Sequence, residues 1–529
     1  MATTRKDIEA ALWRGANTFR GAIDAANYKD YILPMLFVKY LSDTYREKVE
    51  NLEKEYDNPV RLQRAISRLP FVIKEEHSFS WLYEKRYSDN LGELINVALR
   101  GIEDDNPSLF AGIFRSIDFN SEAMLGNHRQ KITRLRELLE DFESLDLRPS
   151  SIKPEEGKVA ADTIGDAYEY MIGEFAGQAG KKAGSFFTPS EVSELMARMV
   201  DPKITDTMYD PTCGSGSLLI KTGKTAMRKE NDVINKLALY GQEMNGSSWS
   251  MAKMNMFVHD ILDAKIAWGD TLVNPLHLDS DGNLMQFDVI VANMPFSQDK
   301  WAAGFNTGGE TDGKGKGKEF KMEASLDKYH RFDWGVPPAS KGDWAFLLHM
   351  IASLKSGGRL AAVAPHGVLF RGASEGRIRK TVIDKNLLDA VIGLPANLFY
   401  GTGIPACILV FKKNRNRDDV LFIDASGKDE SGNLRYKKDK NQNKLETKHI
   451  EDIINAYKDR ADIDKFAHVA SLNEIKANEY NLNIPRYVDT FEEEELVDIE
   501  EVKKNIADIQ VELAEVEAQM ARYLKELGL

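Results

Sequence analysis

The feature that most constrains the fold of this chain is a series of short apolar runs between about residues 160 and 425, each bounded by turn residues. Six of these runs cover residues 207–209, 238–240, 287–292, 359–363, 388–392 and 407–411. Helical patterns of apolar residues separate them, and such strand–helix–strand repetition is typical of a doubly wound α/β sheet. Because these sheets bind ligands outside the carboxyl ends of their strands, we expect functional residues directly after the runs.

The first 150 residues have a different pattern, in which apolar residues recur at helical spacing and no chemical motif is present. Examples are Ile8 with Leu12, and Tyr31 with Met35 and Val38. Residues 144–157 are rich in Ser, Pro and charge, which is typical of a domain boundary. We therefore predict an all-helical domain over residues 1–150, an α/β domain over residues 151–480 and a separate C-terminal segment over residues 481–529.

The C-terminal segment contains an apolar seam with alternating spacings of three and four residues. This pattern predicts one helix with a heptad seam over four heptads. The helix either packs on its own domain or forms a coiled coil with another helix, and the regular seam at a chain end favours the coiled coil. The seam residues are Ile499, Val502, Ile506, Ile509, Leu513, Val516, Met520, Tyr523 and Leu527.

Composition narrows the class of protein. The chain has 529 residues, of which 43% are hydrophobic and 29% charged, so two or three globular domains fit. Its 2 cysteines, Cys213 and Cys407, exclude a disulfide scaffold and a cysteine-based zinc site, and we expect no metal. The N-terminus lacks a secretory signal and no apolar run approaches the roughly 18 residues of a membrane span, so we expect a cytoplasmic protein.

The formal net charge of −13 argues at first against a nucleic-acid-binding protein, whose contact surface should be basic. However, residues 489–529 contain 13 acidic and 4 basic residues, which leaves residues 1–488 with a net charge of only −4. The charge is therefore compatible with an enzyme that acts on DNA. It indicates an enzyme that does not hold DNA unaided and needs a partner.

A glycine-containing turn, Asp210-Pro-Thr-Cys-Gly-Ser-Gly-Ser217, follows the run at 207–209. Gly214 and Gly216 allow a sharp turn and a close approach to a ligand, although neither the dinucleotide-binding nor the P-loop glycine pattern is present. An acid at this strand end disfavours a pyrophosphate and favours a cation. Alone, such a turn is as often structural as functional.

Two further acids are expected at neighbouring strand ends. Glu243 ends the run that begins at Ala238, where a carboxylate can accept hydrogen bonds from ribose hydroxyls. Asp270, in Trp268-Gly-Asp-Thr271, follows a third candidate strand. Each acid alone is typical of a solvated loop, but three acids at successive strand ends indicate a ligand site.

The run at 287–292 leads into Asn293-Met294-Pro295-Phe296. This segment resembles the Asn-Pro-Pro-[Tyr/Phe] signature of amino methyltransferases that use S-adenosylmethionine. The Asn293 side-chain oxygen and the carbonyl of Met294 can accept the two hydrogens of an adenine amine, and Phe296 can stack on a flipped base. Met294 replaces the first proline of the signature; the carbonyl is retained, whereas the rigidity of proline is lost. The alternative interpretation of this segment is an ordinary strand followed by a turn with no catalytic role.

The segment Gly184-Ser-Phe-Phe-Thr-Pro-Ser190 resembles the one that these enzymes place before the glycine turn, where it contacts the methionine part of the cofactor. Its order relative to Asp210–Ser217 and Asn293–Phe296 is that of the gamma class of adenine amino methyltransferases. Segments near both ends of the chain also resemble the N-terminal domain and the C-terminal hallmarks of one protein family. They are residues 20–21, 28–30 and 36–43 near the N-terminus, and residues 440–443 and 478–488 toward the C-terminus. That family is the modification subunit of type I restriction–modification systems.

The resemblance implies a Rossmann-like S-adenosylmethionine-dependent methyltransferase domain and N6-methyladenine in double-stranded DNA as the product. Asn293, Met294, Pro295 and Phe296 would hold the flipped adenine. It also implies that two copies of the chain assemble with one specificity subunit and that a restriction subunit can join. The cofactor would be held by Ser185, Phe186, Phe187, Thr188, Pro189, Ser190, Asp210, Pro211, Thr212, Gly214, Ser215, Gly216, Ser217, Glu243 and, less directly, Asp270.

Other functions remain open at this point. An amino methyltransferase acting on RNA or on protein glutamine would present a similar planar nitrogen, and a subunit that binds cofactor without turnover is compatible with Met294. A self-sufficient restriction enzyme would need a nuclease domain, for which the chain has no space. The polar segment 298–342, with Lys and Gly alternating over residues 312–318, is either a DNA-phosphate contact or a spacer.

Overall fold

The computed structural model describes residues 2–178, 187–230, 237–305, 321–400, 403–439, 442–489 and 499–526. The chain divides into two compact units, residues 1–488 and residues 489–529. In these described ranges, every helix is either too short or too polar to cross a bilayer.

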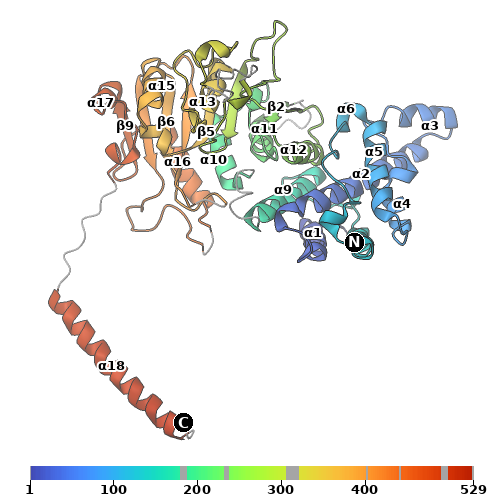
Figure 1. Cartoon of the computed structure of the whole chain (residues 1–529), viewed down its shortest axis with the longest axis horizontal. Helices are drawn as coiled ribbons and strands as arrows, with labels where there is room; N and C mark the ends of the chain where they lie inside the picture. The colour runs from blue at the N-terminus through green and yellow to red at the C-terminus, as the bar shows by residue number, and fades with distance from the viewer. Residues whose placement is uncertain are drawn as a thin grey trace, which may run out of the picture. The chain divides into compact units, whose positions relative to one another are not determined.

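The first 150 residues are helical, which confirms the prediction (Figure 1). Side-chain caps fix several helix starts: Thr4 and Asp7 form a capping box before the first helix, and Asn127 and Gln130 form another before the eighth. The helices are α1 (Arg5–Phe19), α2 (Lys29–Glu55), α3 (Pro59–Ile66), α4 (Phe79–Glu84), α5 (Leu91–Asp105), α6 (Pro107–Phe110), α7 (Glu122–Leu125) and α8 (His128–Glu143).

The second part of unit 1 is built on a 9-stranded sheet with the order β3-β2-β1-β4-β5-β7-β6-β8-β9. All six runs singled out in the sequence are strands, whereas β8 and β9 were not anticipated. The sheet is mixed, because β7 pairs antiparallel with both β5 and β6, and β9 pairs antiparallel with β8. The strands are β1 (Thr207–Asp210), β2 (Ala238–Glu243), β3 (Lys265–Trp268), β4 (Phe287–Asn293), β5 (Leu354–Pro365), β6 (Leu388–Gly393), β7 (Ala406–Lys412), β8 (Asp419–Asp424) and β9 (Ala467–Ser471).

Helices cover both faces of this sheet, as the alternation of side chains along the central strand β4 shows. Val289 and Val291 belong to the core shared with α10, α11 and α16, whereas Ile290 and Ala292 belong to the core shared with α13 and α15. This confirms the α/β fold. The helices of this part are α9 (Ala160–Gln178), α10 (Ser190–Val200), α11 (Ser217–Glu230), α12 (Gly246–Val258), α13 (Asp343–Ala352), α14 (Gly367–Phe370), α15 (Ala373–Asp384), α16 (Thr447–Asp459) and α17 (Leu472–Ala477).

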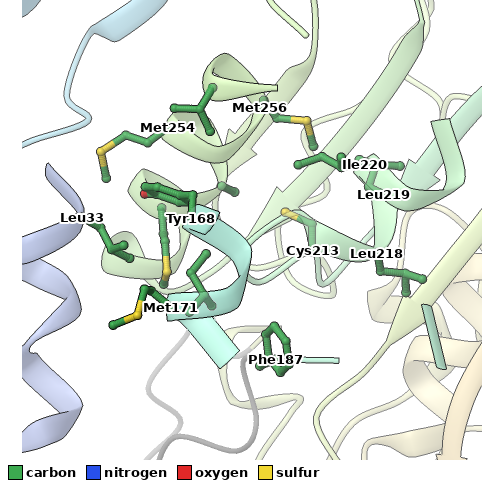
Figure 2. Close-up of a cluster of buried hydrophobic side chains, with 14 of the residues drawn as sticks. Leu33, Tyr168, Met171, Phe187, Cys213, Leu218, Leu219, Ile220, Met254 and Met256 are labelled. Atoms are coloured by element: carbon green, nitrogen blue, oxygen red, sulfur yellow. The ribbon is translucent and has the colours of Figure 1, made fainter. Parts of the chain in front are cut away.

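The helical region and the sheet share one hydrophobic core. Figure 2 shows Leu33 of α2 beside Tyr168 and Met171 of α9, with Met254 of α12 next to them and Cys213 of the β1–α11 turn on the far side. Apolar burial across this contact stabilises the two regions as one body. The segment at 144–157, which the sequence indicated as a boundary, therefore lies within unit 1.

The two units divide after Val488, whereas the sequence placed a boundary after residue 480. The difference has a packing cause: Tyr487 stacks on Phe422 of β8 with ring centroids 3.9 Å apart, so residues up to Val488 belong to the sheet. The described part of unit 2 contains helix α18 (Ile499–Glu526), which confirms the predicted helix. Its seam residues Ile506 and Tyr523 are 50% and 62% exposed, and the coiled coil stays a prediction.

Candidate functional site

The glycine turn connects β1 to α11 through backbone that only glycine adopts without strain. Gly214 and Gly216 have φ values of +54° and +78°, in the left-handed region. A Cβ atom on Gly216 would also lie 3.1 Å from Cε of Met256. The Asp210 side chain, 1% exposed, accepts a hydrogen bond from the Thr212 backbone N–H at 2.9 Å. Both glycines therefore suit the left-handed backbone of the turn, and Gly216 also leaves room for Met256.

Glu243, at the end of β2, holds this turn in place. Its Oε2 accepts a hydrogen bond from Gly214 N–H at 2.9 Å, and its Oε1 accepts one from Asn245 N–H at 2.7 Å. Each carboxylate oxygen keeps a second lone pair, so Glu243 can still accept hydrogen bonds from a ligand.

The two acids make the turn a site that favours a cation. Burial and, to a smaller extent, the charge of Glu243 raise the pKa of Asp210 to about 8. Burial likewise raises the pKa of Glu243. A positively charged ligand would favour the ionised forms of both groups.

Asn293 ends β4 next to the segment that precedes α10. Its Nδ2 donates a hydrogen bond to Oγ1 of Thr188 at 3.1 Å, although the two residues are 105 positions apart in the chain. Pro189 is the N-cap residue of α10 and Ser190 begins the helix. Because the amide nitrogen of Asn293 donates to Thr188, the side chain is oriented so that its Oδ1 can accept a hydrogen bond from another group.

A small pocket brings the three predicted segments together at the carboxyl edge of the sheet. Such an edge is where ligands bind in open α/β sheets. The chemistry of the lining fits S-adenosylmethionine, a cation with many polar groups, because it combines the buried carboxyl of Asp210 with hydroxyls and the backbone of a glycine turn. The lining residues are Thr188, Asp210, Thr212, Cys213, Gly214, Ser215, Ser217, Leu218 and Asn293.

Neighbouring elements that carry no recognisable motif support the turn. Asn255 of α12 donates from Nδ2 to the Ser215 carbonyl at 3.0 Å, and Thr271 donates from Oγ1 to the Pro211 carbonyl at 2.5 Å. Ser215 and Ser217 share a hydrogen bond of 3.1 Å. Sequence reasoning missed Asn255 and Thr271, since a single Asn inside a helix and a Thr in a loop give no local signal.

Asp270 forms the turn that follows β3. Its Oδ1 accepts hydrogen bonds from the backbone N–H groups of Leu272 at 2.8 Å and Val273 at 3.2 Å. It does not line the pocket described above. Buried Arg331, paired with Asp327 at 2.8 Å, donates to the carbonyl of Leu272 at 2.5 Å and so braces this turn.

The remaining predicted residues occupy different environments. Phe187 lies in the hydrophobic core (Figure 2). Its ring centroid is 5.6 Å from that of Tyr400, and it is not a lining residue of the pocket. Met294 is 2% exposed, and Phe296 is partly buried with its ring 6.1 Å from that of Phe399. Ser185 and Phe186 lie outside the described residues, as does the Lys/Gly tract at 312–318.

The backbone just after the Asn293–Phe296 segment is clamped by a buried acid. Asp343 is fully buried at the start of α13, and its Oδ1 accepts a hydrogen bond from Ser297 N–H at 2.6 Å. Its Oδ2 accepts one from Arg371 at 2.9 Å, and Arg371 also contacts Glu375 at 3.0 Å. In the sequence Asp343 reads as an ordinary acid in the first turn of a helix, so this contact was not predicted.

Three groups with metal-binding chemistry, Asp166, Glu169 and His259, lie within 4.8 Å of one another. Lysines already pair with the acids at this cluster: the Lys158 ammonium lies 2.6 Å from Asp166, and the Lys224 ammonium, which pairs with Asp162 of α9, lies 2.6 Å from Nδ1 of His259. We interpret the cluster as an ion-pair network that joins α9 to α11 and α12.

Comparison with known proteins gives consistent matches along the chain. A family model described as N-6 DNA Methylase matches residues 159–496, and one described as HsdM N-terminal domain matches residues 8–142. The methylase subunit of the type I restriction enzyme MpnII of Mycoplasma pneumoniae is 32% identical over 96% of this chain and 93% of its own length. The MjaVIII methylase subunit of Methanocaldococcus jannaschii is 32% identical over 98% of this chain and 84% of its own length.

Solved structures agree with these matches. The methyltransferase subunit of a type I restriction–modification system from Streptococcus thermophilus has 36% sequence identity and a TM-score of 0.75. The match covers 92% of this chain and 100% of that one. A modification subunit of a type I restriction enzyme from Vibrio vulnificus, at 19% identity and a TM-score of 0.63, shares the fold.

Proposed function

Because the chain belongs to the N-6 DNA methylases, and among them to the methylase subunits of type I restriction enzymes, we propose specific roles for its site residues. Membership makes the chain a DNA adenine methyltransferase that uses S-adenosylmethionine and works in a restriction–modification complex. The match to DNA methylases over residues 159–496 sets aside RNA and protein glutamine as substrates. What remains to be assigned is which residues carry the reaction.

We assign the binding of S-adenosylmethionine to three segments. We propose that Thr188 contacts the cofactor from one side, and we extend the proposal to its chain neighbours Ser185, Phe186, Phe187, Pro189 and Ser190. The turn from Asp210 through Pro211, Thr212, Gly214, Ser215 and Gly216 to Ser217 forms the second, and Glu243 with Asp270 the third. The buried acids support this assignment, since a cationic ligand would stabilise the ionised carboxylates that burial alone disfavours. The bound cofactor supplies an electrophilic methyl group.

The target adenine is assigned to Asn293, Met294, Pro295 and Phe296. The adenine amine is a poor nucleophile because its lone pair is delocalised into the ring. Acceptance of its two hydrogens by Asn293 Oδ1 and the Met294 carbonyl would favour a pyramidal nitrogen, and no strong base is needed. Phe296 would stack on the base after it leaves the duplex.

The observation that carries this proposal is the hydrogen bond from Asn293 Nδ2 to Thr188 Oγ1 in the same pocket as Asp210. It fixes the amide so that its oxygen is the free atom. Met294 keeps the backbone carbonyl that the reaction needs, and its burial replaces part of the rigidity that proline would give. We therefore expect this variant of the signature to be active.

The partners of the chain follow from its membership and its C-terminal helix. We propose that two copies assemble with one specificity subunit in the cytoplasm, that a restriction subunit can join, and that the complex acts on double-stranded DNA with a flipped adenine. The exposed seam of α18 supports a coiled-coil contact with the specificity subunit.

The test compares two asparagine variants in the complex with the specificity subunit. Asn293→Ala should lower methyl transfer by about 100-fold or more, because it removes an acceptor needed in the transition state. Its affinity for S-adenosylmethionine, measured by calorimetry, should stay near that of the wild type. Asn51→Ala, on an exposed face of α2, is the matched control and should change neither quantity. Unaltered methyl transfer by Asn293→Ala would refute the assignment.

A further inference from the structure

A second hollow lies along α15 and begins at the end of α14, the short helix that follows β5, the strand paired with β4. This cleft, here named the α15 cleft, has a volume of about 620 Å³. One wall consists of residues 370–380, and the other consists of residues 477–481 together with Arg486. The second wall belongs to the hallmark segment 478–488, to which the reaction described above gives no role.

Hydrogen bonds hold the two walls together, so the cleft is a built feature of unit 1. Arg379, which is 4% exposed, donates from Nε to the Tyr480 carbonyl at 2.7 Å. The Leu482 N–H donates to the Leu369 carbonyl at 2.9 Å. Two segments about a hundred residues apart are therefore fixed against each other.

The lining of the cleft carries an excess of positive charge. Arg377, Arg379, Lys380 and Arg486 line it, against the single acid Glu479. Lys380 pairs with a carboxylate of α15, whereas for Arg377 and Arg486 the described ranges of the chain contain no carboxylate within ion-pair distance. Guanidinium groups without an acidic partner favour an anionic ligand at the cleft. Their planar arrangement of N–H donors suits two hydrogen bonds to the oxygens of one phosphate.

Two glycines leave the backbone of α15 open to such a ligand. Gly372 and Gly376 lie one helical turn apart, and neither has a positive φ that would require glycine. A Cβ atom on Gly372 would meet nothing within 4 Å, and one on Gly376 would come no closer than 3.7 Å to a neighbour. Gly372 is the N-cap residue of α15, a position that glycine readily occupies, whereas for Gly376 neither backbone strain nor packing requires glycine and close approach of a ligand would.

The cleft is connected to the catalytic segment by a short chain of polar contacts. Arg371 lies between the lining residues Phe370 and Gly372, and its guanidinium contacts the Asp343 carboxylate, which in turn holds Ser297. The carbonyl of Arg371 accepts a hydrogen bond from Arg379 at 2.8 Å. The walls of the cleft and the residues after Phe296 are thus held by the same groups.

We propose that the α15 cleft binds phosphate groups of the DNA strand that carries the target adenine. The inference rests on the proposed function. A base can flip out of the duplex when the DNA backbone beside it is fixed in position. Contacts between guanidinium groups and phosphates fix the backbone independently of the DNA sequence. The exposed ring of Phe370, at 48%, offers an apolar contact for the adjoining sugar.

The first test is the salt dependence of DNA binding by the complex with the specificity subunit. Arg377→Gln and Arg486→Gln should each weaken binding and lower the slope of log K against log salt by about one for each phosphate that the variant no longer neutralises. Lys385→Gln removes one charge at the opposite end of the same helix and is the matched control, which should keep the wild-type slope.

The second test narrows the cleft without changing its charge. Gly376→Ala should keep or raise the melting temperature, because alanine favours the helix, and should lower DNA affinity several-fold because its methyl group occupies the cleft. The proposal would be overturned if Arg377→Gln, Arg486→Gln and Gly376→Ala all bound DNA with the wild-type affinity and the wild-type slope of log K against log salt. It would also be overturned by variants that lose binding of inorganic phosphate alone while their DNA affinity is unchanged.

These experiments distinguish a failure of phosphate binding in the α15 cleft from a failure of the proposed DNA methylation. If the wild-type complex transfers no methyl group to DNA, the proposed function fails. If the wild-type complex methylates DNA and the cleft variants bind it as well as Lys385→Gln does, only the inference about the cleft fails.

Discussion

At the scale of single residues, we propose that the Thr188 hydroxyl positions the Asn293 side chain. Thr188→Val preserves the shape of the side chain but removes the acceptor that fixes the Asn293 amide. We expect the single-turnover rate of methyl transfer at saturating cofactor to fall roughly 10- to 100-fold, as for a misplaced catalytic group. Thr188→Ser should restore most of the rate. Thr225→Val, which removes a similar hydroxyl on α11, is the control, and a wild-type rate in Thr188→Val would contradict the assigned role.

The acids of the glycine turn predict a pH dependence of stability without cofactor. Burial holds the pKa of Asp210 at about 8 in the folded protein, whereas an unfolded chain releases this proton near pH 4. The folded state therefore binds more protons between these values, and the free energy of unfolding falls as pH rises, by at most about 1.4 kcal/mol per pH unit. Urea unfolding at pH 6 and pH 8 should show a smaller fall for Asp210→Asn than for the wild type. Equal falls in both proteins would contradict the raised pKa.

Cofactor binding should show the opposite trend with pH. A cationic cofactor favours ionised Asp210, so we expect affinity for S-adenosylmethionine to rise from pH 6 to about pH 8 and then to level off. Calorimetry at pH 7 in two buffers of different ionisation enthalpy should detect proton release on binding. Asp210→Asn should bind more weakly and release fewer protons, and identical proton release in the variant would assign the proton to another group.

At the scale of structural elements, the buried contacts of Asp343 between α13 and the residues after Phe296 should make a measurable contribution to stability. Asp343→Asn weakens the contacts to both Ser297 and Arg371, and we expect a loss of about 2–3 kcal/mol in the free energy of unfolding. Methyl transfer should also slow, since the residues after Phe296 lose their anchor. The exposed Asp333→Asn is the control in urea unfolding. A loss no larger than that of the control would show that the clamp is dispensable.

Elements whose signal is local could be predicted from the sequence. The strands at 207–209 and 287–292, the glycine turn and the acid at Glu243 all follow from residue types at short spacing. The antiparallel direction of β7 could not, because strand direction depends on pairing with β5 and β6 and not on the apolar run itself. Asp343 and Asn255 were missed for the same reason, since their partners lie far away in the chain.

At the scale of the whole molecule, most of the net charge of −13 belongs to the C-terminal unit. Residues 1–488 are close to neutral, so the charge of the chain is compatible with action on DNA. The sequence predicted the helix α18 from its heptads, but a single chain contains no information on the helix that covers the seam. The structure places residues 481–488 with the sheet, because Tyr487 stacks on Phe422, a contact that no sequence pattern indicated.

The seam predicts a separation between folding and assembly. Leu513→Asp should leave the thermal unfolding of residues 1–488 unchanged, because Leu513 is 55% exposed, and should abolish co-purification with the specificity subunit. Val511→Asp introduces the same charge at an equally exposed apolar residue outside the seam and should leave the complex intact. Deletion of residues 495–529 should act as Leu513→Asp does. An intact complex after this deletion would place the interface elsewhere.

The role of Asn293 in DNA adenine methylation is tested most directly by mapping N6-methyladenine in the genome of a host that carries the chain with its specificity subunit. We predict adenines methylated at one recognition sequence with the wild-type chain. We also predict that they are absent when the gene is deleted or when Asn293→Ala replaces it. The same methylated adenines in the deletion strain, or in the Asn293→Ala strain, would contradict this role.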